Sequence, residues 1–558
     1  MSRAPLAATA ALVCLASACP APADAPITTT PSSRPSPPDT AAEVPQLPPV
    51  QQLIRASTAL RGIRPSLDEL AAVEADPAQL AVLVDAYLDD PRLGEVVRDL
   101  HDETLFMSDP TQRYPATGPL AGLEATRIRA SLEASPLRLA EHVVVEDLPY
   151  SELVTADYTV ADPIVAAAWT GLDGYDPAGP EWQVVRWSDG RPAAGLLSDS
   201  GLWSRTRSPN RNFNRRRANY VTRTLLCLDY LDLDVDLAAS DALADPEDPS
   251  VLQSNGVCAA CHTSLDPLAS FLPFRESWGT ADMQWPMQLF TEHGDYWEGL
   301  SGQPPAYFGT PGDDLADLGR SIAADPRFSA CTARRFYSYL AEVPLDEVPA
   351  DIVDELDEQF VAAGLSAKAL LRDVALHPSL QRAEPLPSRP EQLAATIEDL
   401  TGYRWEAYVD EPCCAAPALS SPLGEVDLLR DDLVGYHALA GGIDAYAKLE
   451  PTRTATATGA LVLRRLAGDA AAFVVAADLQ GGTPRLLDRV GPDDTGEDAV
   501  RDQLVALRWR LYGERATPAD VDPGFALWSA TWQRTGSVQE AWTATVAAML
   551  QDFGMAYH

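Results

Sequence analysis

Apolar residues recur at helical spacing along most of the chain. Leu80, Val84, Tyr87 and Leu88 follow one another at steps of three or four positions, and residues 393–400 repeat the pattern. This spacing places apolar side chains on one face of a helix, which then packs against a core. The sequence therefore predicts a mainly α-helical protein.

Polar residues and prolines mark where these helices begin. Ser66 stands three positions before Glu69, so the serine side chain and the glutamate can cap each other's backbone N–H groups. Asp-Pro pairs occur at 76–77, 90–91 and 325–326. Proline is favoured in the first turn of a helix and aspartate just before it. Each of these positions predicts a helix start.

Strand-like sequence is scarce. Residues 143–147 (Val-Val-Val-Glu-Asp) and 184–188 (Val-Val-Arg-Trp-Ser) are rich in β-branched or aromatic residues. We predict that both form short strands.

The composition changes several times along the 558 residues, which exceed the length of an ordinary domain. The predicted segments are a signal peptide at 1–19, a Pro/Thr/Ser-rich tether at 20–48, a helical domain at 49–160, a mixed Trp- and Arg-rich segment at 161–225, a loop-rich domain with its following helices at 226–384, and a second helical domain at 385–558.

The N-terminus indicates export. A short positive start is followed by uncharged residues 4–18, and small residues precede Cys19. This order is typical of a signal peptide, and a cysteine directly after the small residues is typical of a lipoprotein. Ala16 stands where leucine is usual in that motif, and plain secretion is the alternative. We expect an exported protein held by a lipid on Cys19, in the periplasm or at the outer membrane or cell surface.

The charge is strongly negative. Eighty-one acidic residues face 42 basic ones, which gives a formal net charge of −39 at pH 7. Nucleic acid would be repelled by such a surface. The acidity fits a solvated surface or a cationic partner.

Residues 258–262 read Cys-Ala-Ala-Cys-His. This spacing attaches a c-type haem: Cys258 and Cys261 add to the two vinyl groups of one porphyrin, and His262 reaches the iron from the proximal side. A redox-active dithiol would need a βαβ context. Zinc would need a second Cys or His pair at suitable spacing. A histidine beside a plain disulfide is the remaining alternative to one covalent haem c.

The distal iron ligand is open to several residues. Met283 and Met287 follow the motif by about one loop, and His293 comes soon after. A thioether raises the haem potential and a second imidazole leaves it lower. We rank Met283 or Met287 first, then His293, then an open site with water. Core filling is the alternative role for either methionine.

Seven arginines lie within residues 205–223. Guanidinium groups match carboxylates in a bidentate way, so one or two of them could pair with haem propionates. Arg216 and Arg217 are the positions to test. Ion pairs with Asp and Glu of the protein are the alternative.

Export also bears on the remaining cysteines. With Cys19 lipidated and Cys258 and Cys261 on haem, four residues of the mature chain remain: Cys227, Cys331, Cys413 and Cys414. An oxidising compartment permits two disulfides among them, with three possible connectivities. A bond between the neighbours Cys413 and Cys414 would be strained, so we expect each to have a different partner or none.

Four blocks of the chain resemble a known group. They are Arg61-Gly-Ile-Arg-Pro-Ser-Leu-Asp-Glu-Leu70, Arg216-Arg-Ala-Asn-Tyr-Val-Thr-Arg-Thr-Leu-Leu-Cys227, Cys258-Ala-Ala-Cys-His-Thr-Ser-Leu-Asp-Pro-Leu268 and Ala324-Asp-Pro-Arg-Phe-Ser-Ala-Cys-Thr-Ala-Arg-Arg-Phe336. In this order they are similar to planctomycete- and myxobacterial-type exported proteins associated with cytochromes c. The resemblance implies export and haem, and a loop-rich, cytochrome c-like segment around the motif, but it supplies no reaction.

These observations predict an exported lipoprotein that carries one covalent haem and passes single electrons to a redox partner protein. The first alternative is a peroxidase-like haem enzyme with an open distal position. The second is a surface binding or scaffold lipoprotein without a redox role, which the large haem-free segment 385–558 would suit.

Overall fold

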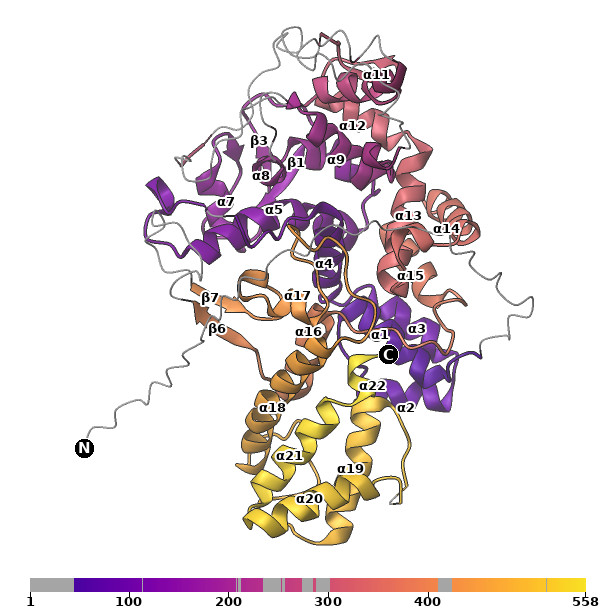
Figure 1. Ribbon diagram of the computed structural model, residues 1–558, viewed down its shortest axis with the longest axis vertical. Helices are drawn as coiled ribbons and strands as arrows, with labels where there is room; N and C mark the ends of the chain where they lie inside the picture. Colours follow the sequence, from indigo (N-terminus) through magenta and orange to yellow (C-terminus); the bar gives the residue numbers. More distant parts are fainter. Residues whose placement is uncertain are drawn as a thin grey trace, which may run out of the picture. The chain divides into compact units, whose positions relative to one another are not determined.

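The computed structural model describes residues 45–112, 114–206, 208, 212–233, 252, 256–272, 285–287, 302–409, 424–517 and 519–558. Within these residues the chain is mainly α-helical, with little sheet (Figure 1). This confirms the fold class that the sequence predicts. The signal peptide, most of the tether and Cys19 lie outside the described residues.

Local sequence explains how the first helices begin and end. The Ser66 hydroxyl accepts a hydrogen bond from the Glu69 N–H at 3.2 Å, and the Glu69 carboxylate accepts one from the Ser66 N–H at 2.6 Å, which confirms the predicted cap. Gly62 ends the preceding helix at a φ of 69°, where a side chain would be strained. The helices of this part are α1 (Pro49–Arg61), α2 (Leu67–Ala75), α3 (Gln79–Tyr87), α4 (Leu93–Leu105), α5 (Ala125–Val145), α6 (Glu152–Thr155), α7 (Pro163–Ala168), α8 (Ser200–Arg205) and α9 (Arg215–Leu226).

Of the three Asp-Pro positions, 325–326 starts a helix directly, whereas the helices that follow 76–77 and 90–91 begin at Gln79 and Leu93. Asp325 caps the helix that starts at Pro326 by accepting the Arg327 N–H at 2.9 Å. The later helices are α11 (Gly256–Ser270), α12 (Leu315–Ala323), α13 (Pro326–Ala341), α14 (Ala350–Ala362), α15 (Ala367–Leu376), α16 (Pro390–Thr401), α17 (Tyr436–Ala440), α18 (Ala457–Leu479), α19 (Glu497–Tyr512), α20 (Asp522–Thr535), α21 (Val538–Leu550) and α22 (Phe553–Ala556).

One of the two predicted strands is confirmed and the other is wrong. Residues 184–188 overlap β3 (Gln183–Trp187), the central strand of an antiparallel sheet in the order β1-β3-β2. Residues 143–147 instead form the end of α5 and the turn after it. Val143 and Val144 are fully buried, and α5 packs against α4. Tertiary packing therefore overrides the weak strand preference of these valines.

The remaining strands are short. The three-stranded sheet is completed by β1 (Tyr158–Ala161) and β2 (Leu172–Asp173). Two further antiparallel pairs are β4 (Ala306–Tyr307) with β5 (Thr310–Pro311), and β6 (Glu406–Val409) with β7 (Gly424–Asp427).

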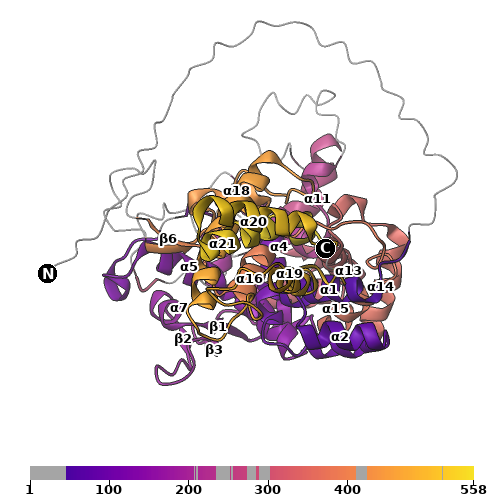
Figure 2. The ribbon, with the colours of Figure 1, turned by 90° about the horizontal axis from the view of Figure 1, so that it is seen from below.

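The buried apolar side chains form three clusters. The first is built largely from helices between α1 and α15 and includes residues of α9, α11 and α13. The second is built from residues 393–555, where α18, α20 and α21 lie together in both views (Figures 1 and 2) and bury Trp528 and Trp542. The third surrounds Trp169 and Trp285 beside the three-stranded sheet.

A disulfide joins the end of α9 to α13. It connects Cys227 with Cys331 across a sequence separation of 104 residues. This is one of the pairings that the sequence left open, whereas Cys413 and Cys414 lie outside the described residues. The closed loop contains α11, so the disulfide fixes both ends of the segment that carries the Cys-Ala-Ala-Cys-His motif.

Helix α18 corresponds to the most apolar long stretch of the sequence. It is interrupted by Arg464, Arg465 and Asp469, and the last two form an ion pair at 2.8 Å. In the described part of the chain, no helix combines the length and the apolar character that crossing a bilayer requires.

Candidate functional site

The motif lies in the first turns of α11. Cys258 and Cys261 are three positions apart, so their side chains share one face of the helix. Both remain thiols and both are half-buried. His262 follows directly and keeps a fifth of its side chain exposed. The three residues that the sequence singled out are therefore together on the accessible part of one helix.

A buried carboxylate holds the histidine. His262 Nδ1 lies 2.9 Å from Asp266 Oδ1, one helical turn further along α11. Arg215 of α9 binds the same carboxylate through two N–H groups, at 2.6 Å and 2.9 Å. The Asp266 side chain is only 1% exposed, so these partners replace the water that an ionised carboxylate needs.

The charge state of Asp266 follows from these contacts. Burial alone would raise the pKa of Asp266, but the hydrogen bonds from His262 and Arg215 outweigh it and hold the pKa below its ordinary value. An ionised Asp266 can only accept, so Nδ1 of His262 carries the proton. Nε2 is then the nitrogen with a lone pair for a metal.

Packing fixes the orientation of α11. Leu265 and Leu268 are buried in the first cluster, and α11 packs against α9 and β4 (Figure 1). The hydroxyl of Tyr230, which follows α9, lies 2.8 Å from the hydroxyl of Ser264 on α11. Leu231, directly after Tyr230, is 84% exposed. An apolar side chain is therefore left in solvent next to the segment that touches α11.

The Cys261 thiol lacks the lowered pKa of a reactive cysteine. Burial and the neighbouring Cys258 raise the pKa of the Cys261 thiol. The thiolate is the nucleophile in disulfide exchange. The environment of Cys261 therefore disfavours the form that exchanges disulfides.

The residues predicted as distal ligands do not lie beside α11 in the described part of the chain. Met287 is buried in the third cluster, where its backbone bonds to Ala168 and Thr170. No α11 residue belongs to that cluster as the described residues define it. Met283 and His293 lie outside the described residues. The distal ligand therefore stays a prediction.

The arginines of 205–223 have several roles. Arg217 is buried and donates to the backbone carbonyls of Thr206 and Trp203, at 2.7 Å and 3.3 Å. Arg216 is exposed on α9. Arg215 forms the ion pair with Asp266, which is the kind of contact that the sequence kept as the alternative to propionate binding.

Sequence reasoning missed Asp266 and Arg215 as site residues. Asp266 could have been found, because a residue four positions after His262 on a helix faces the same side. Arg215 could not, since 51 residues separate it from Asp266 and only the packing of α9 on α11 brings them together.

The described residues contain no group of three or more His, Cys, Asp or Glu side chains placed to hold a metal ion. No family model, no curated protein and no solved structure matches this chain. Function is therefore argued from the site alone. The site offers two neighbouring thiols, an imidazole held by a carboxylate, and an arginine that neutralises the carboxylate.

Proposed function

We propose that this chain carries one haem c, bound through Cys258 and Cys261, and passes single electrons at the cell envelope. His262 is the proximal ligand in this proposal. The observation that carries it is the contact between His262 Nδ1 and the buried Asp266 carboxylate. That contact selects the tautomer and the ring orientation that a metal-binding imidazole needs.

The residues present fit the group. The thiols lie on one helix face at the spacing that two vinyl groups require, and both are accessible enough to be modified. Leu231, which follows the Tyr230 that contacts Ser264 of α11, is an exposed apolar residue, and a porphyrin is largely apolar. A bound haem supplies an iron that gains and loses one electron.

The chain's own residues would tune and protect that centre. Asp266 accepts a hydrogen bond from Nδ1–H of His262 and increases the basicity of the ligating nitrogen. Arg215 offsets the carboxylate charge, so the pair remains stable in a buried position. The Cys227–Cys331 disulfide limits how far the loop that contains α11 can open.

Export and the lipid anchor belong to the same proposal. The signal sequence and Cys19 support them, and so does the disulfide, which is typical of an oxidising compartment. Haem c is attached outside the bacterial cytoplasm. An exported chain thus meets the attachment machinery where the motif can be used.

A second candidate is a haem enzyme with an open distal position that acts on peroxide. Two observations favour it: Asp266 strengthens the electron donation from His262, and Met287 is packed in a different cluster from α11. Binding of carbon monoxide or cyanide distinguishes the two functions, because an open site takes these ligands readily and a six-coordinate electron carrier does not.

The test is expression of the full chain with its own signal in a host that matures c-type cytochromes. We expect a denaturing gel to show haem-dependent peroxidase staining that disappears in the Cys258→Ala/Cys261→Ala variant. Thr263→Ala, at an exposed position of α11, is the matched control and should keep the stain. An exported wild-type protein without stain, beside a stained control cytochrome, would refute the proposal and leave the binding or scaffold function.

A further inference from the structure

A second feature of the molecule is a cavity of about 560 Å³ at the far end of α9. It is lined by residues of α4, the end of α9 with the segment after it, α13, and residues 345–346 and 449–453. None of the described lining residues belongs to α11. Its volume is within the range of small-molecule sites. The cavity is thus distinct from the haem candidate.

Three arginines that form no ion pair with another described residue line this cavity. Arg223, Arg335 and Arg453 all line it, and among the described residues no ion pair joins any of them to a carboxylate. In a chain with 81 acidic and 42 basic residues, carboxylates are abundant partners. Three guanidinium groups around one cavity that have no ion pair within the described part of the chain therefore need an explanation.

Two of these arginines form one cationic end. Arg335 Nε donates to the Thr224 carbonyl at 3.0 Å, and one of its terminal nitrogens donates to the Arg223 carbonyl at 2.6 Å. The guanidinium of Arg223 lies over the Phe106 ring, 4.9 Å from its centroid. Burial, with repulsion from Arg223, lowers the pKa of Arg335 to about 10, which still leaves it charged at neutral pH. Carbonyls hold these groups in place without neutralising them.

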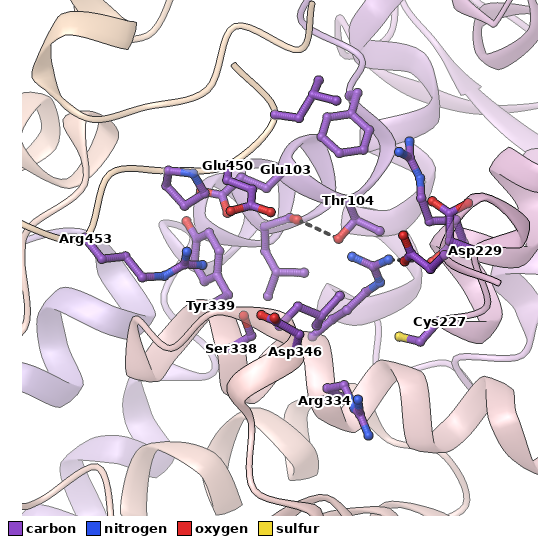
Figure 3. Close-up of a pocket in the computed structure, with 18 residues that line it drawn as sticks. Glu103, Thr104, Cys227, Asp229, Arg334, Ser338, Tyr339, Asp346, Glu450 and Arg453 are labelled. Carbon is purple, nitrogen blue, oxygen red and sulfur yellow. Dashed lines mark hydrogen bonds between the residues drawn. The ribbon is translucent and has the colours of Figure 1, made fainter. Parts of the chain in front are cut away.

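Arg453 forms the opposite end. Figure 3 shows it beside Tyr339, across the cavity from Cys227 and Asp229 at the end of α9. Its buried Nε has no hydrogen-bond partner within the described part of the chain. A buried donor without a partner costs free energy unless a ligand or water supplies the acceptor.

Five acidic residues among the described ones also line the cavity. Glu103 and Asp229 are half-buried, but Glu103 is paired with Arg389 and Asp229 accepts a hydrogen bond from Asn219. Asp232, Asp346 and Glu450 are exposed, whereas Arg223, Arg335 and Arg453 are half-buried. Two charges near a protein surface interact roughly four times more strongly than two charges at the same distance in bulk water. Exposed carboxylates are further screened by salt. The arginines therefore dominate for a group that enters the cavity.

We propose that this cavity binds a small organic anion with two carboxylate groups, one held by Arg223 and Arg335 and the other by Arg453. Guanidinium groups recognise carboxylates through paired N–H donors. Two separated cationic ends favour a dicarboxylate over a single compact anion. This site is independent of the haem proposal, because the cavity is not lined by the haem-binding residues Cys258, Cys261 and His262, nor by Asp266 or Arg215.

The experiment is isothermal titration calorimetry on the purified full-length protein with succinate and longer straight-chain dicarboxylates. We expect saturable binding to at least one of them, which weakens as salt is added. Arg453→Gln and Arg223→Gln should each reduce the affinity at least tenfold. Arg320→Gln, at an exposed position of α12 that does not line the cavity, is the matched control and should change it less than twofold.

Three results would overturn the proposal: no saturable binding at millimolar dicarboxylate, affinity unchanged in both variants, or tighter binding of inorganic phosphate through the same arginines. Circular dichroism on each variant checks that it is folded. Arg335 is left unchanged, because its bonds to the Thr224 and Arg223 carbonyls support the contact between α9 and α13. The haem stain of these variants should be unaffected, so failure here is separate from failure of the haem proposal.

Discussion

The disulfide between Cys227 and Cys331 makes a prediction that can be worked out from the structure. It closes a loop with a sequence separation of 104 residues, and that loop includes α11. Replacing both cysteines with alanine leaves the native contacts of α9 and α13 in place but frees the unfolded or opened loop. The change therefore tests how strongly closure stabilises the segment with the haem motif.

The expected magnitude follows from the loop length. Closing a loop of about 100 residues removes chain entropy worth about 4.7 kcal/mol at 25 °C, and loss of native disulfides commonly costs about 2–5 kcal/mol. Because about 1.4 kcal/mol is a factor of ten, the upper value corresponds to roughly three powers of ten in the opening equilibrium. The free energy of opening of the 227–331 segment should fall by an amount in this range.

Hydrogen exchange measured by mass spectrometry is the appropriate assay, because a chain of several helical clusters has no single free energy of unfolding. We expect backbone amides of α11 and α13 to lose protection in Cys227→Ala/Cys331→Ala, while those of α18 and α21 keep theirs. Reductant should reproduce this loss in the wild-type protein and leave the double variant unchanged. Less than a tenfold change in exchange for α11 would refute the reasoning.

Three further predictions concern buried groups. Arg215→Ala should lower the free energy of opening of α9 and α11, measured by hydrogen exchange, by about 3–5 kcal/mol, because Asp266 is then a buried charge without its guanidinium; a change below about 1 kcal/mol would contradict this. Burial alone would lower the pKa of His437, but Glu391 at 2.5 Å outweighs it and raises the pKa to about 9. The stabilisation from this pair is complete below pH 6.5, the ordinary pKa of histidine, and is lost as the pH rises through about 9. The slope of stability against pH in this range should vanish in His437→Gln. Trp542→Ala should destabilise the C-terminal helices by about 3–5 kcal/mol in thermal unfolding, since the side chain is fully buried, and an unchanged midpoint would refute this.

The sequence alone determined those features that depend on neighbours within about one helical turn. The Ser66 cap and the helix start at Asp325 follow from side chains that bond to the backbone two or three positions away. The Cys-Ala-Ala-Cys-His motif indicates haem attachment by the spacing of its residues alone. Helical geometry then places Asp266 on the same face as His262. Such contacts need no knowledge of the rest of the chain.

Only the tertiary structure decided which distant groups meet. The approach of Arg215 to Asp266, the pairing of Cys227 with Cys331, and the arginines around the second cavity all join segments that are far apart in sequence. The error at 143–147 has the same origin, because burial against α4 outweighs the local preference of the valines. Local propensities differ by less than about 1 kcal/mol per residue, whereas burial of one large apolar side chain contributes about 1.5–3 kcal/mol. Packing therefore settles whatever the local sequence leaves nearly balanced.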